Sequence, residues 1–551
     1  MYRYDGYDSK MLEERVRQFR GQTQRYLDGS LSDSEFLPLR LQNGLYVQRL
    51  APMLRIAIPY GMLNATQLRK LAFISSHYDK GYGHFTTRQN IQFNWPALED
   101  VPELLEHLAE VEMHAIQTSG NCIRNTTTDQ FAGVAANELE DSRPYCEIIR
   151  QWSTFHPEFA YLPRKFKIAV CGTEEDQAAT QVHDIGIYLK RNDSGEIGFQ
   201  ILAGGGLGRT PVIGQVVFEH VEKCDLLSAL EAILRVYNRE GRRDNKYKAR
   251  IKILVRETGL EAFKAKVFAE WDKLRGGALT LTDAEIARCK GYFQDPAYEN
   301  CGDAPHELTD ALARDVMFAS WHSNNVSPHK QPGYAAVTVS FKKTGYAPGD
   351  VSEEQLGLLA DLAERYSFGE VRITHNQNVV LADVPQTRLF ELYSSLAAGA
   401  LEADNLNSLN DIICCPGGDF CALANAKSIP IAEAIQRKFD DRGLLADIGE
   451  VSLNISGCMN ACGHHHVGNI GILGVDKKGA EFYQVSLGGS SKRQAALGKI
   501  LGPSFAQEEI PEVIADVIAV YRDQKTPGES FLETVQRTGL DPFKARVYSK
   551  D

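Results

Sequence analysis

The stretch "HFTTRQNIQF" at residues 84–93 returns in altered form as "RITHNQNVVL" at residues 372–381, and this repetition decides the fold. Each copy has a Thr that is followed after three positions by a Gln-Asn pair. Upstream of each copy, the alternating apolar residues of "LRIAI" (54–58) and "AVTVS" (336–340) predict a strand. Both copies therefore predict a strand, a turn, a helix, a second strand, a short polar loop and a second helix.

A second and weaker repeat follows each copy of the first. The segments that begin at Lys167 and Val451 each predict a strand, then an "IGIYL" or "IGILG" strand, a polar turn, another strand and a Gly-rich end. The chain thus has the order A–B–A′–B′, which indicates a gene duplication. We expect two halves related by a pseudo-two-fold axis, with a site between them.

The composition limits the class of protein. A chain of 551 residues, 43% hydrophobic and 24% charged, predicts two to four globular domains. No apolar run reaches the roughly 18 residues that a membrane span needs, and the polar N-terminus lacks the apolar region of a secretory signal. A net charge of −12 argues against non-specific nucleic-acid binding. We therefore expect a cytoplasmic protein that binds neither membranes nor nucleic acids.

Four of the 11 cysteines have spacings that are typical of metal ligands. Cys415 and Cys421 are spaced C-x5-C, and Cys458 and Cys462 are spaced C-x3-C. Zinc sites typically use C-x2–4-C pairs, whereas a 4Fe–4S cluster has metal atoms at separate corners and accepts wider loops. Glycines beside the cysteines leave space and N–H donors near sulfide. The spacing favours a cluster, with a structural zinc or buried thiols as alternatives.

The residues beside these cysteines are not expected to ligate the metal. Cys414 lies beside Cys415 and is expected to pack, because adjacent cysteines cannot easily face one site. A run of three histidines cannot all face one metal either. We therefore expect His464, His465 and His466 to hydrogen-bond an anion or a neighbouring loop.

Two further segments have both a binding and a structural interpretation. The Gly-rich "AGGGLGR" at residues 203–209 either cradles phosphate or carboxylate oxygens on its backbone N–H groups or forms a strand-end turn. It lacks the G-x-G-x-x-G spacing of a Rossmann fingerprint. The segment 235–256 holds nine Lys or Arg residues against two acidic residues. It is either a solvated helix face or a local site for an anion rich in carboxylates.

The cysteine pairs, together with three motifs of the first half, carry a family resemblance. They resemble the sirohaem and iron–sulfur reductases, which comprise sulfite reductase haemoprotein subunits and ferredoxin-type nitrite reductases. The three motifs are "TTRQNIQF" (86–93), "GNCIRN" (120–125) and "LPRKFK" (162–167). The resemblance covers the chain from about Asn43 onward. It implies an α+β fold with an N-terminal extension (1–42), ferredoxin-like half-domains (43–115 and 326–400) and two sirohaem-type reductase domains (116–325 and 401–551), the second carrying the cluster ligands.

The resemblance also implies the cofactors and the site. Cys415, Cys421, Cys458 and Cys462 would hold a 4Fe–4S cluster, and Cys462 would bridge to the iron of a sirohaem. The basic residues around the substrate would be Arg88, Arg124, Lys165 and Lys167. Further contacts to the cofactors are expected from Arg164, Gln89, Asn125, Gly205 and Arg209. A small oxyanion and the carboxylates of sirohaem both require dense positive charge, which Arg and Lys supply.

Taken without the family, these basic residues have ordinary structural interpretations. Alternate residues of a strand share a face, so Lys165 and Lys167 point to one side and Arg164 to the other. Such a segment is also typical of a basic edge strand, and Arg88 of a surface strand end. The second copy has Asn376 where the first has Arg88. We therefore expect the second copy to contact a cofactor or the structure without being catalytic.

The residue at position 167 is expected to distinguish the sulfite reductases of this family from its nitrite reductases. Sulfite-reducing members resemble "RKFK" here, whereas plant-type nitrite reductases tend to carry Asn at the last position. A second ammonium favours the larger sulfite dianion. We expect an assimilatory sulfite reductase that makes sulfide with six electrons. The alternatives are a nitrite reductase that makes ammonia and, more distantly, a zinc-stabilised binding protein without catalysis.

The chain has no segment that resembles a flavin or NADPH domain, so the electrons must come from a partner. Either a ferredoxin or a separate flavoprotein reductase could donate them. The sequence assigns no role to Tyr46 or Arg55, which could approach the macrocycle, nor to Cys122, which lies two residues before Arg124.

Overall fold

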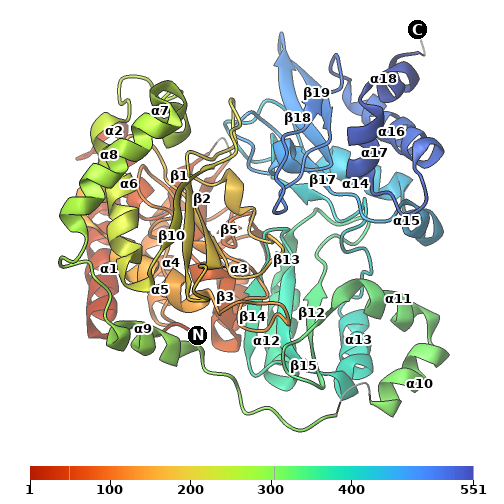
Figure 1. The fold of residues 1–551 in the computed structure, drawn as a ribbon, viewed down its shortest axis with the longest axis horizontal. Helices are drawn as coiled ribbons and strands as arrows, with labels where there is room; N and C mark the ends of the chain where they lie inside the picture. The colour runs from red at the N-terminus through yellow and green to blue at the C-terminus, as the bar shows by residue number, and fades with distance from the viewer. Residues whose placement is uncertain (49, 303–304, 550–551) are drawn as a thin grey trace.

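The computed structural model describes residues 1–48, 50–302 and 305–549, and within them the strands form four five-stranded sheets (Figure 1). The first sheet has the order β1 (Leu45–Val47), β2 (Pro52–Ile56), β5 (Ile91–Phe93), β4 (Tyr82–Phe85) and β13 (Asp350–Ser352). The second has the order β11 (Val326–Pro328), β12 (Tyr334–Val339), β15 (Val379–Pro385), β14 (Glu370–Ile373) and β3 (Met62–Asn64).

These two antiparallel sheets exchange one strand each. β3 belongs to the first copy of the repeat but pairs with β14, and β13 belongs to the second copy but pairs with β4. The exchange joins the interiors of the two copies, and residues such as Leu68 and Leu359 pack in one hydrophobic core. The duplication expected from the two Gln-Asn stretches is confirmed, whereas the residue boundaries of the individual domains stay a prediction.

Two equivalent helices pack together at this junction. α3 (Ala65–Tyr78) and α12 (Glu353–Tyr366) each span 14 residues. Each begins with a capping box, in which Gln67 or Gln355 bonds back to the residue that caps the helix. Arg69 on α3 forms an ion pair of 2.7 Å with Glu364 on α12. The two copies of the repeat therefore begin their first helix in the same way.

The other two sheets share a mixed topology. One has the order β6 (Thr127–Thr128), β7 (Ile168–Cys171), β8 (Ile185–Arg191), β9 (Ile197–Ala203) and β10 (Gln215–Val221). The other has the order β16 (Ile413–Cys414), β17 (Leu453–Ser456), β18 (Ile470–Lys477), β19 (Ala480–Leu487) and β20 (Lys499–Ile500). In both, the first two pairs of strands are parallel and the last two antiparallel. This match confirms the second, weaker repeat.

Helices cover each mixed sheet with apolar side chains. α6 (Leu226–Glu240) and α8 (Leu260–Leu274) contribute to the core of the first sheet, and α14 (Ile429–Lys438) and α16 (Ile510–Gln524) to that of the second. Figure 1 shows the two layers on opposite sides of the molecule. The remaining helices are α1 (Gly6–Leu27), α2 (Asp33–Gln42), α4 (Val101–Ala109), α5 (Arg143–Ser153), α7 (Ile251–Thr258), α9 (Asp283–Lys290), α10 (His306–Arg314), α11 (Val316–Asn325), α13 (Leu389–Ala398), α15 (Arg442–Ile448), α17 (Phe531–Thr538) and α18 (Asp541–Tyr548).

The N-terminal extension forms α1 and α2, and it packs on the first half-domain. Phe19 and Phe36 are buried in the same core as the two antiparallel sheets. Across the described part of the chain, no helix has both the length and the apolar content needed to cross a bilayer.

Candidate active site between the two halves

Two buried glutamines connect the half-domains to the mixed sheets. The Gln377 side chain accepts a hydrogen bond of 2.8 Å from Cys414 N–H and donates one of 2.9 Å to the carbonyl of the same residue. Gln89 makes the equivalent pair with Thr128, at 3.0 and 2.9 Å. Both glutamines have a left-handed backbone, with φ of 54° and 62°. These bonds fix the ends of β6 and β16, so Gln377 positions the loop that begins at Cys415.

The four cysteines lie in the loops that follow β16 and β17. Because these strands are parallel neighbours, their following loops leave the same edge of the sheet. Gly457 N–H donates to Cys415 Sγ at 3.2 Å, and Gly457 O accepts from Asn425 N–H at 2.8 Å. A Cβ atom on Gly457 would lie 2.6 Å from Gly417 Cα. Glycine therefore allows the two loops to approach closely enough to share a ligand.

The spacing of the sulfurs distinguishes a cluster from a single zinc. Zinc binds thiolate at about 2.3 Å in a tetrahedron, which holds the sulfurs roughly 3.8 Å apart. Among the described residues, no three of the four Sγ atoms lie within 4.8 Å of one another. Burial and the neighbouring Cys462 raise the pKa of Cys415, so the thiols need positive charge to ionise together. The donor set fits a larger iron–sulfur cluster better than one metal ion.

Two lysines face this centre without a partner. Lys165 and Lys167 flank the buried Phe166, and neither Nζ donates a hydrogen bond to a described residue. Burial lowers the pKa of Lys165, against the opposing charge of Cys462. Burial and the charge of Lys165 lower the pKa of Lys167. Two partly buried ammonium groups that repel each other form a site that an anion would stabilise.

Arg124 lies beside two residues to which the sequence assigned no role. The carbonyl of Thr118 accepts hydrogen bonds from both Arg124 Nη1, at 2.7 Å, and Arg55 Nη1, at 3.3 Å. The Arg55 guanidinium also lies 5.6 Å from the centre of the Tyr46 ring. Burial raises the pKa of Tyr46, but Arg124, Arg55 and Lys165 outweigh it, so the pKa lies below its ordinary value.

The sequence named Arg55 and Tyr46 as residues that could approach the macrocycle, and the structure places both beside Arg124. The charge of Arg55 also reaches Cys421, whose pKa burial raises. The only sequence signal was an Arg within an otherwise apolar strand, "LRIAI". That signal does not reveal that β1 and β2 lie against the residues around Arg124.

Arg88 is held in place by the first half of the chain. Its Nη1 donates to Thr127 Oγ1 at 2.9 Å and its Nη2 to the carbonyl of Asn125 at 2.6 Å. His183 Nε2 accepts from Arg88, since His183 Nδ1 donates to the carbonyl of Ala179. Arg88 has no carboxylate partner, and its buried Nε has no partner at all among the described residues. Burial and the charge of Arg124 lower the pKa of Arg88 to about 9.

The amides of two other expected site residues, Gln89 and Asn125, already have partners in the protein. Gln89 bonds to Thr128, and Asn125 Nδ2 donates to the carbonyl of Ile58 at 2.7 Å and to Asn90. Contact of either residue with a cofactor stays a prediction. Gly205 is packed against backbone, whereas Arg209 is exposed and has no described partner.

Arg164 lies in a bend ahead of β7, and its Nη1 donates to Asn121 Oδ1 at 3.4 Å. Burial and the charges of Arg124 and Arg250 lower its pKa, so it belongs to the same group of cations. Cys122 Sγ donates to the carbonyl of Ser119 at 3.3 Å, and burial raises its pKa. The contacts of Arg164, Gly205 and Arg209 with a cofactor stay predictions.

The three histidines do not form a metal site. His464 has a left-handed backbone and is buried near Lys167, and His466 Nε2 bonds to the carbonyl of Gly208 at 3.0 Å. The ring centres of His465 and His466 lie 3.9 Å apart, with the two rings tilted by 41°. The run therefore fixes the loop after Cys462 against the Gly-rich segment 203–209, in agreement with the expected loop contact.

The basic segment 235–256 has one part on the surface and another that faces the site, so each of its two predicted roles holds for part of it. Arg242 pairs with Asp244 at 2.5 Å on the surface. Arg250, in contrast, turns inward and binds Asp184 at 2.8 and 2.7 Å, while Lys252 Nζ donates to the carbonyl of Leu207 at 2.7 Å. Only the last part of the segment adds positive charge to the site.

This charge distribution fits a polycarboxylate macrocycle. The site gathers six cations around the loop of Cys462: Arg88, Arg124, Lys165, Lys167, Arg250 and Lys252. Burial and the charges of their cationic neighbours lower the pKa values of Arg88, Lys165, Lys167 and Lys252. Asp184 is the carboxylate that repeatedly offsets them. Partly buried cations in excess of nearby anions are stabilised by anionic ligands. The residues present therefore fit both a cluster and an anionic tetrapyrrole.

Comparison with known families gives the same answer. Residues 119–274 and 406–551 match the family described as "Nitrite and sulphite reductase 4Fe-4S domain". Residues 48–111 and 327–399 match the "Nitrite/Sulfite reductase ferredoxin-like half domain". The chain belongs to the nitrite and sulfite reductase family. Like the other members of this oxidoreductase family, it uses a 4Fe–4S cluster and a sirohaem, and the expected duplicated α+β fold is confirmed.

Individual relatives of this chain include both sulfite reductases and nitrite reductases. The chain is 27% identical to sulfite reductase (ferredoxin) 2 of Mycolicibacterium paratuberculosis, over 98% of this chain and 91% of that protein. It is 29% identical to the ferredoxin–nitrite reductase of Synechococcus elongatus, over 85% of both chains. The structure of the NirA protein of Mycobacterium tuberculosis has the same fold, with a TM-score of 0.79 at 24% identity and 97% coverage of both chains.

Proposed function

We propose that this protein reduces sulfite to sulfide with six electrons that a ferredoxin delivers, in assimilatory sulfur metabolism. The observation that carries the proposal is the pair of unpartnered ammonium groups of Lys165 and Lys167, in the electrostatic field of Cys462. A small dianion gains more than a monoanion from two compact cations in a site of low dielectric constant. Lys167 is therefore the residue on which the choice of sulfite depends.

In this proposal the cluster is held by Cys415, Cys421, Cys458 and Cys462. Cys462 would also hold the sirohaem, because the ammonium groups of Lys165 and Lys167, which would surround the substrate, lie within the electrostatic reach of its thiolate. The coupled pair of cofactors, when bound, supplies the electrons one at a time. The protein itself binds and orients the anion and moves protons.

The cations have different tasks. Arg124 presents a planar, permanently charged guanidinium to the oxygen atoms of the anion. Arg88 is anchored by backbone carbonyls, so its charge keeps a fixed orientation. Lys165 and Lys167 have depressed pKa values and are suited to donate the protons that leave with each oxygen as water.

A nitrite reductase is the second candidate. The similarity to the Synechococcus protein, whose name states that activity, favours it at 29% identity. Ferredoxin appears in the names of relatives of both kinds, which supports the proposed donor for either substrate. Nitrite carries a single charge, and the second lysine is less important for its binding.

The test is the ratio of sulfite to nitrite turnover of the holoenzyme with reduced ferredoxin, in the wild type and in Lys167→Asn. We expect the wild type to prefer sulfite, and Lys167→Asn to lower kcat/KM for sulfite about tenfold and for nitrite much less. Lys190→Asn, on the surface of the same sheet, is the matched control. A wild type that prefers nitrite, or an unchanged ratio in Lys167→Asn, would overturn the assignment to sulfite.

A further inference from the structure

A carboxylate and an imidazole from opposite halves of the chain meet close to the loop of Cys415. His84 on β4 is 3% exposed, and its Nδ1 lies 2.7 Å from Oδ1 of Asp350 on β13. The two residues stand directly opposite each other in the antiparallel pair of these strands. Because β13 is an exchanged strand, the second copy of the repeat supplies the carboxylate and the first copy supplies the imidazole.

The carboxylate determines where the imidazole carries its proton. A carboxylate accepts hydrogen bonds, so His84 Nδ1 donates to Asp350 and His84 Nε2 is left as an acceptor. This Nε2 lies 3.0 Å from Gln377 Nε2. The same amide nitrogen donates to the carbonyls of Phe85 at 2.8 Å and Cys414 at 2.9 Å. The two hydrogens of the amide therefore face three acceptors, one of which is the imidazole.

The oxygen of this amide reaches the backbone of the cysteine loop. Gln377 Oε1 accepts a hydrogen bond of 2.8 Å from Cys414 N–H, and Cys415 is the next residue. Three hydrogen bonds thus lead from the carboxylate of Asp350, through the imidazole and the amide, to a peptide group beside the first proposed ligand. Hydrogen bonds in such a chain polarise one another, so the charge at one end acts on the peptide group at the other.

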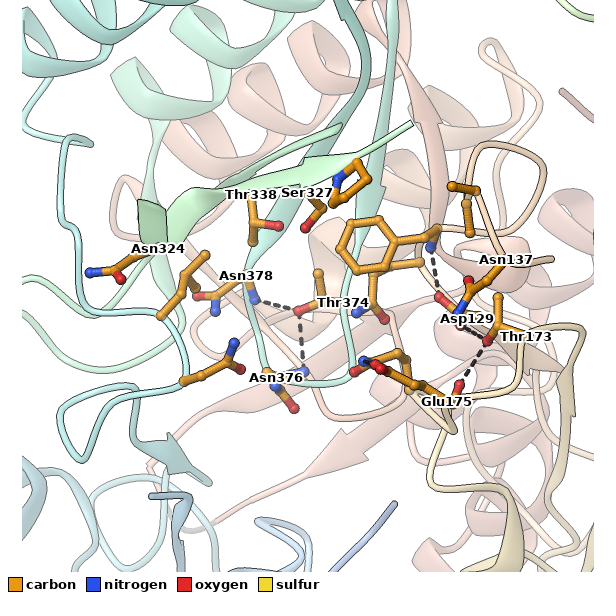
Figure 2. A pocket seen from close by; sticks show the side chains of 18 of the residues that line it. Asp129, Asn137, Thr173, Glu175, Asn324, Ser327, Thr338, Thr374, Asn376 and Asn378 are labelled. Atoms are coloured by element: carbon orange, nitrogen blue, oxygen red, sulfur yellow. Dashed lines mark hydrogen bonds between the residues drawn. The ribbon is translucent and has the colours of Figure 1, made fainter. Parts of the chain in front are cut away.

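The backbone around Gln377 is held in place separately. Asn376 N–H and Asn378 N–H both donate to Thr374 Oγ1, at 3.2 and 3.0 Å (Figure 2). They enclose Gln377 in its left-handed conformation, with φ of 62°. The same stretch lines a cavity of about 480 Å³ that Asp129 and two further carboxylates also line. Because the backbone is fixed, the hydrogen-bond partners of the amide decide its orientation.

The equivalent amide, that of Gln89, has no imidazole beside it. Its Nε2 donates to the carbonyls of Thr128 at 2.9 Å and Ile373 at 3.0 Å, and these two acceptors use both hydrogens. Gln89 fixes the end of β6, which no cysteine follows directly. Two backbone acceptors are therefore enough to hold a glutamine of this kind, and the third acceptor of Gln377 is an addition.

Both members of the pair are replaced in the counterpart. Arg372 stands at the position of His84, and Met62 lies opposite it, at the position of Asp350. The Arg372 guanidinium donates to the carbonyls of Gln130 and Ala132. The carboxylate–imidazole pair thus accompanies only the amide that bonds the cysteine loop, so the pair serves that loop and not the fold of the repeat.

We propose that Asp350 and His84 are positioning residues of the cofactor centre, which orient the Gln377 amide and thereby set the reduction potential of the cluster. The inference rests on the proposed ligation of the cluster by Cys415. Cluster potentials depend on the net charge nearby and on the hydrogen bonds around the ligands. The negative charge of Asp350 disfavours an added electron, so the pair lowers the potential.

EPR-monitored redox titration of the holoenzyme tests the proposal. Asp350→Asn keeps an acceptor for His84 Nδ1 and removes the charge. We expect the equilibrium constant for reduction of the cluster to rise about fivefold, which is about 40 mV for one electron. His84→Gln interrupts the chain of hydrogen bonds, so adding Asp350→Asn to it should change the potential much less. Glu354→Gln, in the exposed first turn of α12, removes the same charge elsewhere and should leave the potential unchanged.

Iron and labile sulfide per chain, measured on the same samples, separate this inference from the proposed ligation. A wild type without labile sulfide would overturn both. With the cluster present, the inference is overturned if Asp350→Asn shifts the potential no more than Glu354→Gln does. It is also overturned if Asp350→Asn shifts the potential equally with and without His84→Gln. A purely structural pair would lower the melting temperature of the variants and leave the potential where it is in the wild type.

Discussion

Thr87 Oγ1 donates a hydrogen bond of 2.8 Å to the carbonyl of Cys462. The two residues are 375 positions apart in the chain, and both belong to loops at the junction of the halves. The bond ties the "TTRQN" stretch of the first copy to the cysteine proposed to ligate both cofactors. In the duplicated architecture, a residue of the first half, Thr87, thus holds the cysteine loop of the second half.

Thr87→Val tests this anchor, because it keeps the shape of the side chain and removes the donor. The net loss of one hydrogen bond is about 1 kcal/mol, and it acts on the loop of Cys462. We expect lower sirohaem occupancy and a shifted reduction potential of the centre, measured by absorption-monitored redox titration. Thr66→Val, in the exposed first turn of α3, should change neither quantity. If Thr87→Val keeps full sirohaem occupancy and an unchanged reduction potential, the hydrogen bond has no role at the cofactor centre.

Gly457→Ala tests the close approach of the two cysteine loops. The added Cβ would lie 2.6 Å from Gly417 Cα and from the carbonyl of Ala426, which is backbone that cannot move aside cheaply. We expect loss of acid-labile sulfide and of the visible spectrum, since the cysteine pairs separate. Gly357→Ala, on α12 with open space around it, should keep both. Normal sulfide content in Gly457→Ala would show that the loops tolerate a wider separation.

Cys421→Ser and Cys414→Ser separate a ligand from a packing residue. Cys414 is buried and its Sγ donates to the carbonyl of Cys415 at 3.2 Å, so it points away from a shared ligand. We expect Cys421→Ser to lose most iron and labile sulfide, and Cys414→Ser to keep them. The measurement is iron and sulfide per chain on protein from a sirohaem-competent host. Equal losses in both variants would contradict the assignment of Cys421 to the cluster.

Asp129→Asn should stabilise the protein in a pH-dependent way. Burial raises the pKa of Asp129 to about 6, partly offset by the hydrogen bonds from Thr173 and Phe131. The unfolded value is about 3.9, so ionisation destabilises the fold as pH rises from about 4 to about 6, and the full cost of about 3 kcal/mol persists above that range.

The variant should therefore unfold at a higher temperature than the wild type at about pH 7.5, and the gap should close near pH 4. Differential scanning calorimetry in amine-free buffer measures it. An equal difference in unfolding temperature at both pH values would mean that the pKa of Asp129 is not raised in the folded protein.

The sequence by itself determined the local pattern of this protein. The spacing of Cys415, Cys421, Cys458 and Cys462, the repeated Gln-Asn pairs and the shared face of Lys165 and Lys167 depend only on neighbours in the chain. Strand alternation and loop spacing act over a few residues, so they can be inferred without knowing what packs against them.

The tertiary structure decided which of these patterns meet. Arg55 and Tyr46 join Arg124 because β1 and β2 pack beside a loop some 70 residues away. Gln89 has a left-handed backbone and bonds the backbone of β6, a partner 39 residues away that its neighbours in the chain do not reveal. The exchange of β3 and β13, and the acidic cavity around Asp129, arise from contacts between the halves. Such contacts depend on the packing of distant surfaces, and a periodic pattern in the sequence identifies a face without naming its partner.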